Sequence, residues 1–241
     1  AVDAVIVGAT SSVPAVAIDP AGNVMVLWNQ SDGAKPRVWA NQYVVASGLW
    51  TGAAPISNDA GTAVSSIQVA TDVLGNMVAV WSQDLRIWAA RFNGTGATWA
   101  AAERVEGATG STNFGPKVAV DRDGNAFVLW SQRTGQLANP EHIWANRWTS
   151  GAWGDAGRLE SDVVAAKYAS VATCGSGDAV AVWIHNAMLK PNVYANRWTT
   201  GAWQGAVRID AEDGGSAGGP PGVGCDDAGV ALAFWLQSAG G

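Results

Sequence analysis

Aromatic residues recur in four short segments of the chain, and in three of these segments an asparagine follows two positions later. Each segment places an aromatic residue two positions before a small or amide residue, as in Trp144 and Asn146. Residues two apart lie on one face of an extended strand, so the ring could stack on a sugar while the amide binds its hydroxyl groups. Packing between sheets is the structural alternative. The predicted ligand-binding residues are Trp39, Asn41, Trp88, Trp144, Asn146, Tyr194 and Asn196.

The chain contains two histidines, which are expected at one irregular edge of the fold. His142 begins one predicted strand and His185 ends another. A two-histidine site for a borderline metal such as copper is an alternative use of this pair. Glu141 is the one carboxylate close to them in sequence, and no third ligand is evident. We therefore expect no cofactor.

The two cysteines, Cys174 and Cys225, lie near the ends of equivalent strands in neighbouring repeats. A disulfide between them would join two adjacent repeats and would suit an oxidising compartment. Their positions differ by one residue in the repeat alignment, so the side chains could also point apart. The sequence leaves the pairing open.

These residues belong to a repeat of about 50 residues. Each unit carries a glycine in a D-x-x-G-N-like turn and a tryptophan six residues later. The glycines are Gly22, Gly75, Gly124, Gly177 and Gly229, and the tryptophans are Trp28, Trp81, Trp130, Trp183 and Trp235. Both faces of the strand that holds each tryptophan are apolar, which indicates burial on both sides.

Four short strands in each unit predict an all-β, five-bladed β-propeller that forms a single domain over residues 1–241. The expected units are residues 13–66, 67–115, 116–168 and 169–219, with a closing blade from 220–241 and 1–12. No segment matches the third strand of the closing blade. That blade could have three strands, continue beyond residue 241, or take a strand from another chain, so an oligomer is possible. A two-sheet sandwich is the alternative fold.

Composition excludes two classes of partner. The formal net charge is −6, with no basic stripe to neutralise nucleic-acid phosphates. No run of 18 apolar residues occurs that could span a membrane. The chain opens at Ala1 without methionine, is poor in lysine and has 14 tryptophans and two cysteines. We expect an exported bacterial protein, either secreted, periplasmic or on the cell surface.

The units resemble those of bacterial and invertebrate β-propeller lectins. The shared features are the glycine after the first hairpin, the tryptophan of the second strand and the aromatic residue of the third. The chain has neither the Ser-x-Asp-x-Gly-x-Thr-Trp box of sialidases nor the Trp-Asp dipeptide of WD repeats. The resemblance implies repeated sugar pockets, each lined by an aromatic residue and a few polar side chains.

We expect the chain not to be an enzyme. A regular repeat places identical residues at equal intervals around a fold, whereas catalysis needs one site with different residues in different roles. With two histidines, no Ser-His-Asp set can be argued. The predicted function is a non-catalytic, carbohydrate-binding protein with a glycan or cell-surface partner. The alternatives are a protein-docking or structural propeller and a copper-binding protein.

Overall fold

The computed structural model describes residues 11–58, 64–107, 111–135, 139–161, 164–175, 177–186, 190–210 and 216–238. Within these ranges the chain folds entirely into β-strands, turns and loops, without a helix. The same ranges accordingly hold no helix that could cross a membrane. The strands form five consecutive antiparallel sheets, which we call the first to the fifth sheet in chain order.

The first three sheets share one plan. The first sheet contains β1 (Ser11–Ile18), β2 (Val24–Ser31), β3 (Pro36–Val44), β4 (Leu49–Trp50) and β5 (Ala54–Pro55). The second contains β6 (Val64–Thr71), β7 (Met77–Gln83), β8 (Arg86–Asn93), β9 (Thr98–Trp99) and β10 (Glu103–Arg104). The third contains β11 (Ser111–Val120), β12 (Ala126–Thr134), β13 (His142–Thr149), β14 (Ala152–Trp153) and β15 (Gly157–Arg158).

The fourth sheet repeats this plan, and the fifth is smaller. The fourth contains β16 (Ala166–Thr173), β17 (Ala179–His185), β18 (Asn192–Thr199), β19 (Ala202–Trp203) and β20 (Val207–Arg208). The described part of the fifth sheet is a hairpin of β21 (Ala217–Cys225) and β22 (Ala231–Gln237). Residues 1–10, the predicted closing strand, lie outside the described residues.

The outermost strand of each complete sheet is broken, whereas the sequence predicted one continuous fourth strand. In the fourth sheet, β19 and β20 both pair with β18 but are separated by Gly205, which has a φ of 109°. The side chain of Asn196 lies at this break and accepts a hydrogen bond from the Gly205 N–H at 3.0 Å. A side-chain amide thus replaces the missing rung of the ladder, which keeps the interrupted backbone satisfied.

The tight turn between the first two strands is set by its aspartate and its glycine. In the second sheet, Asp72 accepts hydrogen bonds from the backbone and side-chain nitrogens of Asn76, at 2.9 and 2.7 Å. Gly75 has a φ of 80°, a conformation that favours glycine. A Cβ on Gly75 would also lie 3.2 Å from Oδ2 of Asp19 in the preceding sheet. The turn therefore needs glycine both for its shape and for close packing of adjacent sheets.

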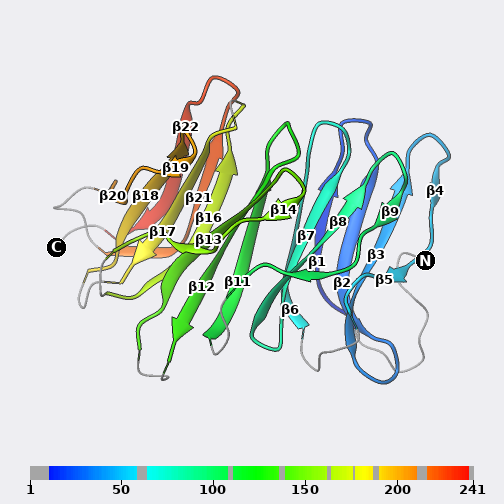
Figure 1. The fold of residues 1–241 in the computed structure, drawn as a ribbon, viewed down its shortest axis with the longest axis horizontal. Coiled ribbons are helices and arrows are strands. Elements are labelled where there is room, and N and C mark those ends of the chain that lie inside the picture. The colour runs from blue at the N-terminus through cyan, green and yellow to red at the C-terminus, as the bar shows by residue number, and fades with distance from the viewer. Residues whose placement is uncertain are drawn as a thin grey trace.

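The five sheets follow one another in a row, with the first and fifth sheets at opposite ends (Figure 1). The innermost strands of successive sheets contact each other, from β1 through β6, β11 and β16 to β21. This arrangement agrees with stacked propeller blades. The number of blades, the closure of a ring and the single-domain assignment remain predictions.

The core lies between the sheets. We call the face that a sheet turns toward the next sheet its forward face, and the opposite face its rear face. Between the second and third sheets, forward-face residues Val78 and Val80 pack with rear-face residues Val128 and Trp130. The indole N–H of Trp130 donates to Oε1 of Gln132 at 2.9 Å, so a fully buried donor has its partner.

Candidate functional site

The four predicted sugar-stacking rings are half-buried side chains between sheets. Each faces the tryptophan of the second strand across the ladder, as Trp144 faces Trp130 and Tyr194 faces Trp183. The rings of Tyr194 and Trp183 are stacked, with centroids 6.4 Å apart. The rings that pack against the apolar clusters between sheets are Trp88, Trp144 and Tyr194. The indole N–H of Trp39 donates to the Gln30 carbonyl at 3.0 Å.

The predicted amides are buried and bind backbone. Asn146 donates to the carbonyl of Val105 in the preceding sheet at 2.8 Å, and Asn196 donates to that of Leu159 at 3.1 Å. Asn41 accepts from the N–H of Gly52 at 3.0 Å. These bonds give the repeated asparagine a structural task, because it joins adjacent sheets at the break in the outer strand. Its part in ligand binding remains a prediction.

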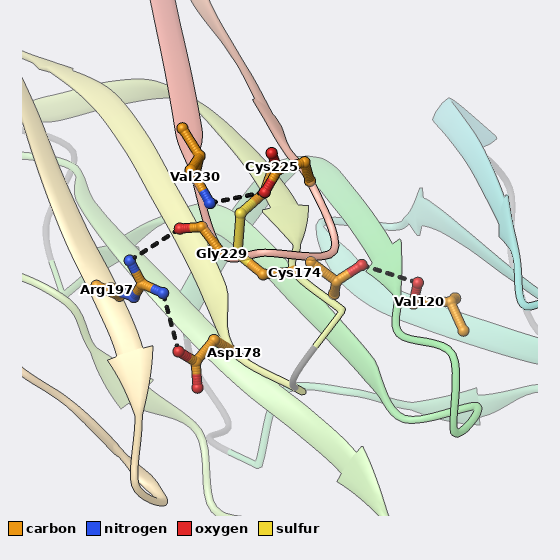
Figure 2. The surroundings of a disulfide bond; sticks show 9 residues. Val120, Cys174, Asp178, Arg197, Cys225, Gly229 and Val230 are labelled. Carbon is orange, nitrogen blue, oxygen red and sulfur yellow. Dashed lines mark hydrogen bonds and ion pairs between the residues drawn. A yellow bond between two sulfur atoms is a disulfide. The ribbon is translucent and has the colours of Figure 1, made fainter.

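The two cysteines form a disulfide between the fourth and fifth sheets (Figure 2). Cys174 follows β16 and Cys225 ends β21, with their Cα atoms 5.1 Å apart. Beside the disulfide, Arg197 of β18 reaches the Gly229 carbonyl at 3.2 Å and Asp178 at 3.0 Å. The two-stranded fifth sheet is therefore tied to its neighbour covalently and by an arginine.

A buried acidic side chain recurs just after the outer strand of three sheets. In the third sheet, Glu160 accepts from the backbone N–H of Ile143 at 3.0 Å and from Nε of Arg158 at 2.6 Å. In the second sheet, Glu106 bonds the Ile87 N–H and Arg104 in the same way. The sequence signal is an arginine two residues before the acid, repeated as Arg104–Glu106, Arg158–Glu160 and Arg208–Asp210. The sequence analysis missed this signal.

The third sheet adds a histidine to this arrangement. Nδ1 of His142 lies 3.1 Å from Oε1 of Glu160, and the ring is half-buried. Burial holds the pKa of His142 below its ordinary value; Glu160 opposes this shift, and Arg158 and His185 reinforce it. The imidazole is therefore neutral at pH 7, with Nδ1 oriented by a carboxylate and Nε2 on the far side of the ring. A neutral, oriented imidazole can act as a general base.

The fourth sheet contacts the third sheet next to His142. The backbone N–H of Ala166 donates to the Glu141 carbonyl at 2.7 Å, so Lys167 and His142 flank one contact between sheets. The next residue, Tyr168, is exposed and has a φ of 59° in a bulge of β16. Nζ of Lys167 lies 5.0 Å from the centre of the Tyr168 ring. We name His142, Arg158 and Glu160 the rim cluster.

His185 is placed differently from His142, although the two were considered together. It is buried at the end of β17, and its ring meets the Tyr194 ring edge-on with centroids 4.8 Å apart. Among the described residues, no group of three or more histidine, cysteine, aspartate or glutamate side chains is arranged to hold a metal ion. The rim cluster thus depends on His142, whereas His185 packs against an aromatic ring.

A cavity of about 430 Å³ lies between the second and third sheets, at the end of the sheets that carries the D-x-x-G-N turns. Asn76, Arg91, Trp99 and Asp123 are among its lining residues. The guanidinium of Arg91 lies 3.4 Å from the centre of the Trp148 ring and 3.8 Å from Glu103. Because its arginine already binds protein groups, we assign this cavity no role in the chemistry.

Comparisons with known proteins identify the fold. No protein-family model matches the chain, and no curated protein matches its sequence. Its structure is similar to an ulvan lyase, a polysaccharide lyase, with a TM-score of 0.65 and 7% identity over 93% of this chain and 61% of that one. It is also similar to an α-L-arabinanase of Penicillium chrysogenum, with a TM-score of 0.62 and 11% sequence identity over 93% of this chain and 74% of the arabinanase. A protein of unknown function from Dyadobacter fermentans has a TM-score of 0.63 and 10% sequence identity over 88% of this chain and 71% of its own.

These similarities support a β-propeller architecture and correct one expectation. The prediction of a non-catalytic, lectin-like binding protein that is not an enzyme is wrong, because similar solved structures include a polysaccharide lyase and an arabinanase. The earlier argument assumed that repeats carry identical residues. They differ at single positions: His142 stands where β8 has Arg86, and Glu160 where the first sheet has Ser57. The chain has the all-β fold of propeller enzymes that act on carbohydrates.

Proposed function

We propose that this chain is an exported enzyme that cleaves polysaccharides, with the rim cluster as its catalytic site. The observation that carries this proposal is the contact of His142 with Glu160, backed by Arg158. It supplies a neutral base whose ring is held by a buried carboxylate. The disulfide supports export, because such bonds persist in oxidising compartments.

The rim cluster favours elimination over hydrolysis. Hydrolysis ordinarily uses two carboxyl groups that flank the bond to be cleaved. Glu160 is instead engaged by a backbone N–H, an arginine and a histidine. Elimination needs a base that removes the proton next to the carboxylate of a uronic acid, and a cation that stabilises the resulting charge. His142 fits the first task, and Arg158, bound to the same Glu160, is a cation for the second.

The elimination balances in bonds and protons. The imidazole of His142 takes the proton from C5 of the uronic acid, and the electrons of that bond form the double bond between C4 and C5. The bond from C4 to the glycosidic oxygen breaks, and the leaving oxygen takes a proton from a hydroxyl group or water. Arg158 is the cation that would stabilise the charge on the uronate carboxylate. Neither a metal nor an oxidant is required.

The test is an assay of the purified chain on uronate-containing polysaccharides, with arabinan as a neutral substrate. Ultraviolet absorbance reports the unsaturated product of elimination, and a reducing-end assay reports cleavage of either kind. We expect elimination on a uronate polymer, and a rate lowered by about 10²–10⁴-fold in His142→Gln.

The matched control is His185→Gln, because glutamine occupies the equivalent position in four sheets, at Gln30, Gln83, Gln132 and Gln237. This variant should keep its activity. Full activity of His142→Gln would contradict the assigned base. Cleavage that yields reducing ends without absorbance would replace elimination with hydrolysis, and no cleavage of any polymer would contradict the proposed function.

A further inference from the structure

The two ends of the row of sheets each expose an apolar face. At one end, the forward face of β22 presents Leu232, Phe234 and Leu236, all exposed, with 65% of Phe234 accessible. At the other end, the rear face of β1 presents Val16 and Ile18, with 59% of Val16 accessible. We call these the β22 face and the β1 face. Large contiguous apolar surfaces of this kind are typical of interaction sites.

Equivalent positions within the row are covered. On β17, Val180, Val182 and Ile184 occupy the places of the three exposed residues of β22, and all three are buried. Val180 and Val182 pack with residues of the fifth sheet, and so does Ile184. On the rear faces, Val69, Val118 and Val171 occupy the place of Val16 and pack into the clusters between sheets. Among the described residues, the two end faces have no neighbouring sheet packed on them.

The two uncovered faces are complementary in kind. Every boundary between sheets joins the forward face of one sheet to the rear face of the next. The β22 face is a forward face and the β1 face is a rear face. They lie at opposite ends of the row and so do not cover each other within the chain (Figure 1). None of the strands β1, β2, β21 and β22 contains a charged residue, so no like charges would meet.

We propose that the β22 face binds the β1 face of a second copy of this chain. The contact repeats between copies the packing that already joins successive sheets within one copy. It is heterologous, because two different surfaces meet, so each copy keeps one face for a further partner until the assembly closes. The disulfide between Cys174 and Cys225 supports this contact by anchoring the two-stranded sheet that carries the β22 face. The inference does not depend on the proposed enzymatic function.

The first experiment measures mass by light scattering over a range of concentrations. We expect the chain to assemble beyond the monomer, and Phe234→Asp and Val16→Asp each to prevent this by placing a charge in the contact. Leu74→Asp is the matched control, because Leu74 is exposed on a turn of the second sheet, away from both end faces. It should assemble like the original chain.

The decisive experiment mixes the two variants. Phe234→Asp keeps an intact β1 face and Val16→Asp keeps an intact β22 face, so an equimolar mixture should form a heterodimer and nothing larger. Circular dichroism and an intact disulfide verify the fold. Leu236→Asp and Ile18→Asp repeat the design if either first variant fails to fold.

Two results would overturn the proposal. A chain that remains monomeric at every concentration excludes the second copy as the occupant. A chain that assembles but is affected by Phe234→Asp alone would indicate that two β22 faces meet each other. Recovery of a heterodimer from two monomeric variants is the result that supports the head-to-tail contact.

Discussion

The second strands of the fourth and fifth sheets have nearly the same pattern and opposite environments. β17 reads AVAVWIH and is buried at every position, whereas β22 reads ALAFWLQ and is exposed at its first residue, Ala231, and at every second position from Leu232. Val182 is 0% accessible, and Phe234, its equivalent, is 65% accessible. This difference shows that the burial of a strand in this fold depends on whether the next sheet covers it, and not on the strand's own residues.

The arginines of the third strands show the same contrast. Arg147 lies over the Trp198 ring of the following sheet, 5.6 Å from its centre. Arg197 is the equivalent residue one sheet later, and the described part of the fifth sheet has no third strand to supply a ring. Arg197 instead bonds Asp178 and the Gly229 carbonyl (Figure 2). Substitutions in the covered sheets and in the end sheet can test this contrast.

The largest effect is expected from removing the tryptophan of a covered strand. Trp130→Ala should lower the free energy of unfolding by about 3–5 kcal/mol, because it leaves a large cavity between two sheets. Trp235→Ala in β22 should lower the free energy of unfolding by clearly less, since the Trp235 ring is half-buried. Urea denaturation of both variants measures the difference. Equal losses would mean that the fifth sheet is covered in solution.

The second change removes the covalent anchor of the end sheet. Replacing Cys174 and Cys225 together by serine should lower the free energy of unfolding by about 2–4 kcal/mol. The loss should be local, because the disulfide joins only the fourth and fifth sheets. Hydrogen exchange should show faster exchange in β21 and β22, with the second and third sheets unchanged. A loss of protection spread evenly over all sheets would contradict this expectation.

The third change tests the asparagine that joins adjacent sheets. Asn146→Ala should lower the free energy of unfolding by about 1–3 kcal/mol, because the carbonyl of buried Val105 and that of Gly154 lose their donor. Asn93→Ala is the control, since Asn93 is exposed and bonds only within its own turn. If the two variants are equally stable in thermal melts, the asparagine does not hold the sheets together.

The smallest effect is a pH dependence at the boundary between the third and fourth sheets. Burial lowers the pKa of His142 from its ordinary 6.5, so the unfolded chain binds the proton at a higher pH than the folded chain. Stability should therefore fall as the pH drops below 6.5 toward the folded pKa, and be unaffected by this group above 6.5. The fall should be reduced in His142→Gln. Urea denaturation midpoints measured above and below pH 6.5 report this loss of stability. An equal loss in His142→Gln would assign the pH dependence to other groups.

The strand pattern was readable from the sequence because it is local. Apolar residues on both faces of the strand that holds Trp130 predicted burial on both sides, and the turn at Asp72 and Gly75 predicted a hairpin. The break in the outer strand was not predicted, because it depends on the side chain of Asn196 reaching a different strand.

The candidate site was only half visible in the sequence. His142 was noted, but its partner Glu160 was not, because 18 residues separate them and only the pairing of β13 with β15 brings them together. The amides of Asn146 and Asn196 looked accessible in a one-dimensional pattern and are buried against backbone.

By itself, the sequence determined the repeat, the strands and the residues that can fill a core, since these follow from periodicity and turn chemistry within about 50 residues. Tertiary structure decided which of the apolar faces are covered, which histidine meets a carboxylate, and that Cys174 meets Cys225. The physical reason is that burial, pKa and disulfide geometry depend on which atoms lie within a few ångströms. For burial and for the disulfide those atoms belong to the neighbouring sheet, and for His142 they belong to Glu160, 18 residues away in the same sheet.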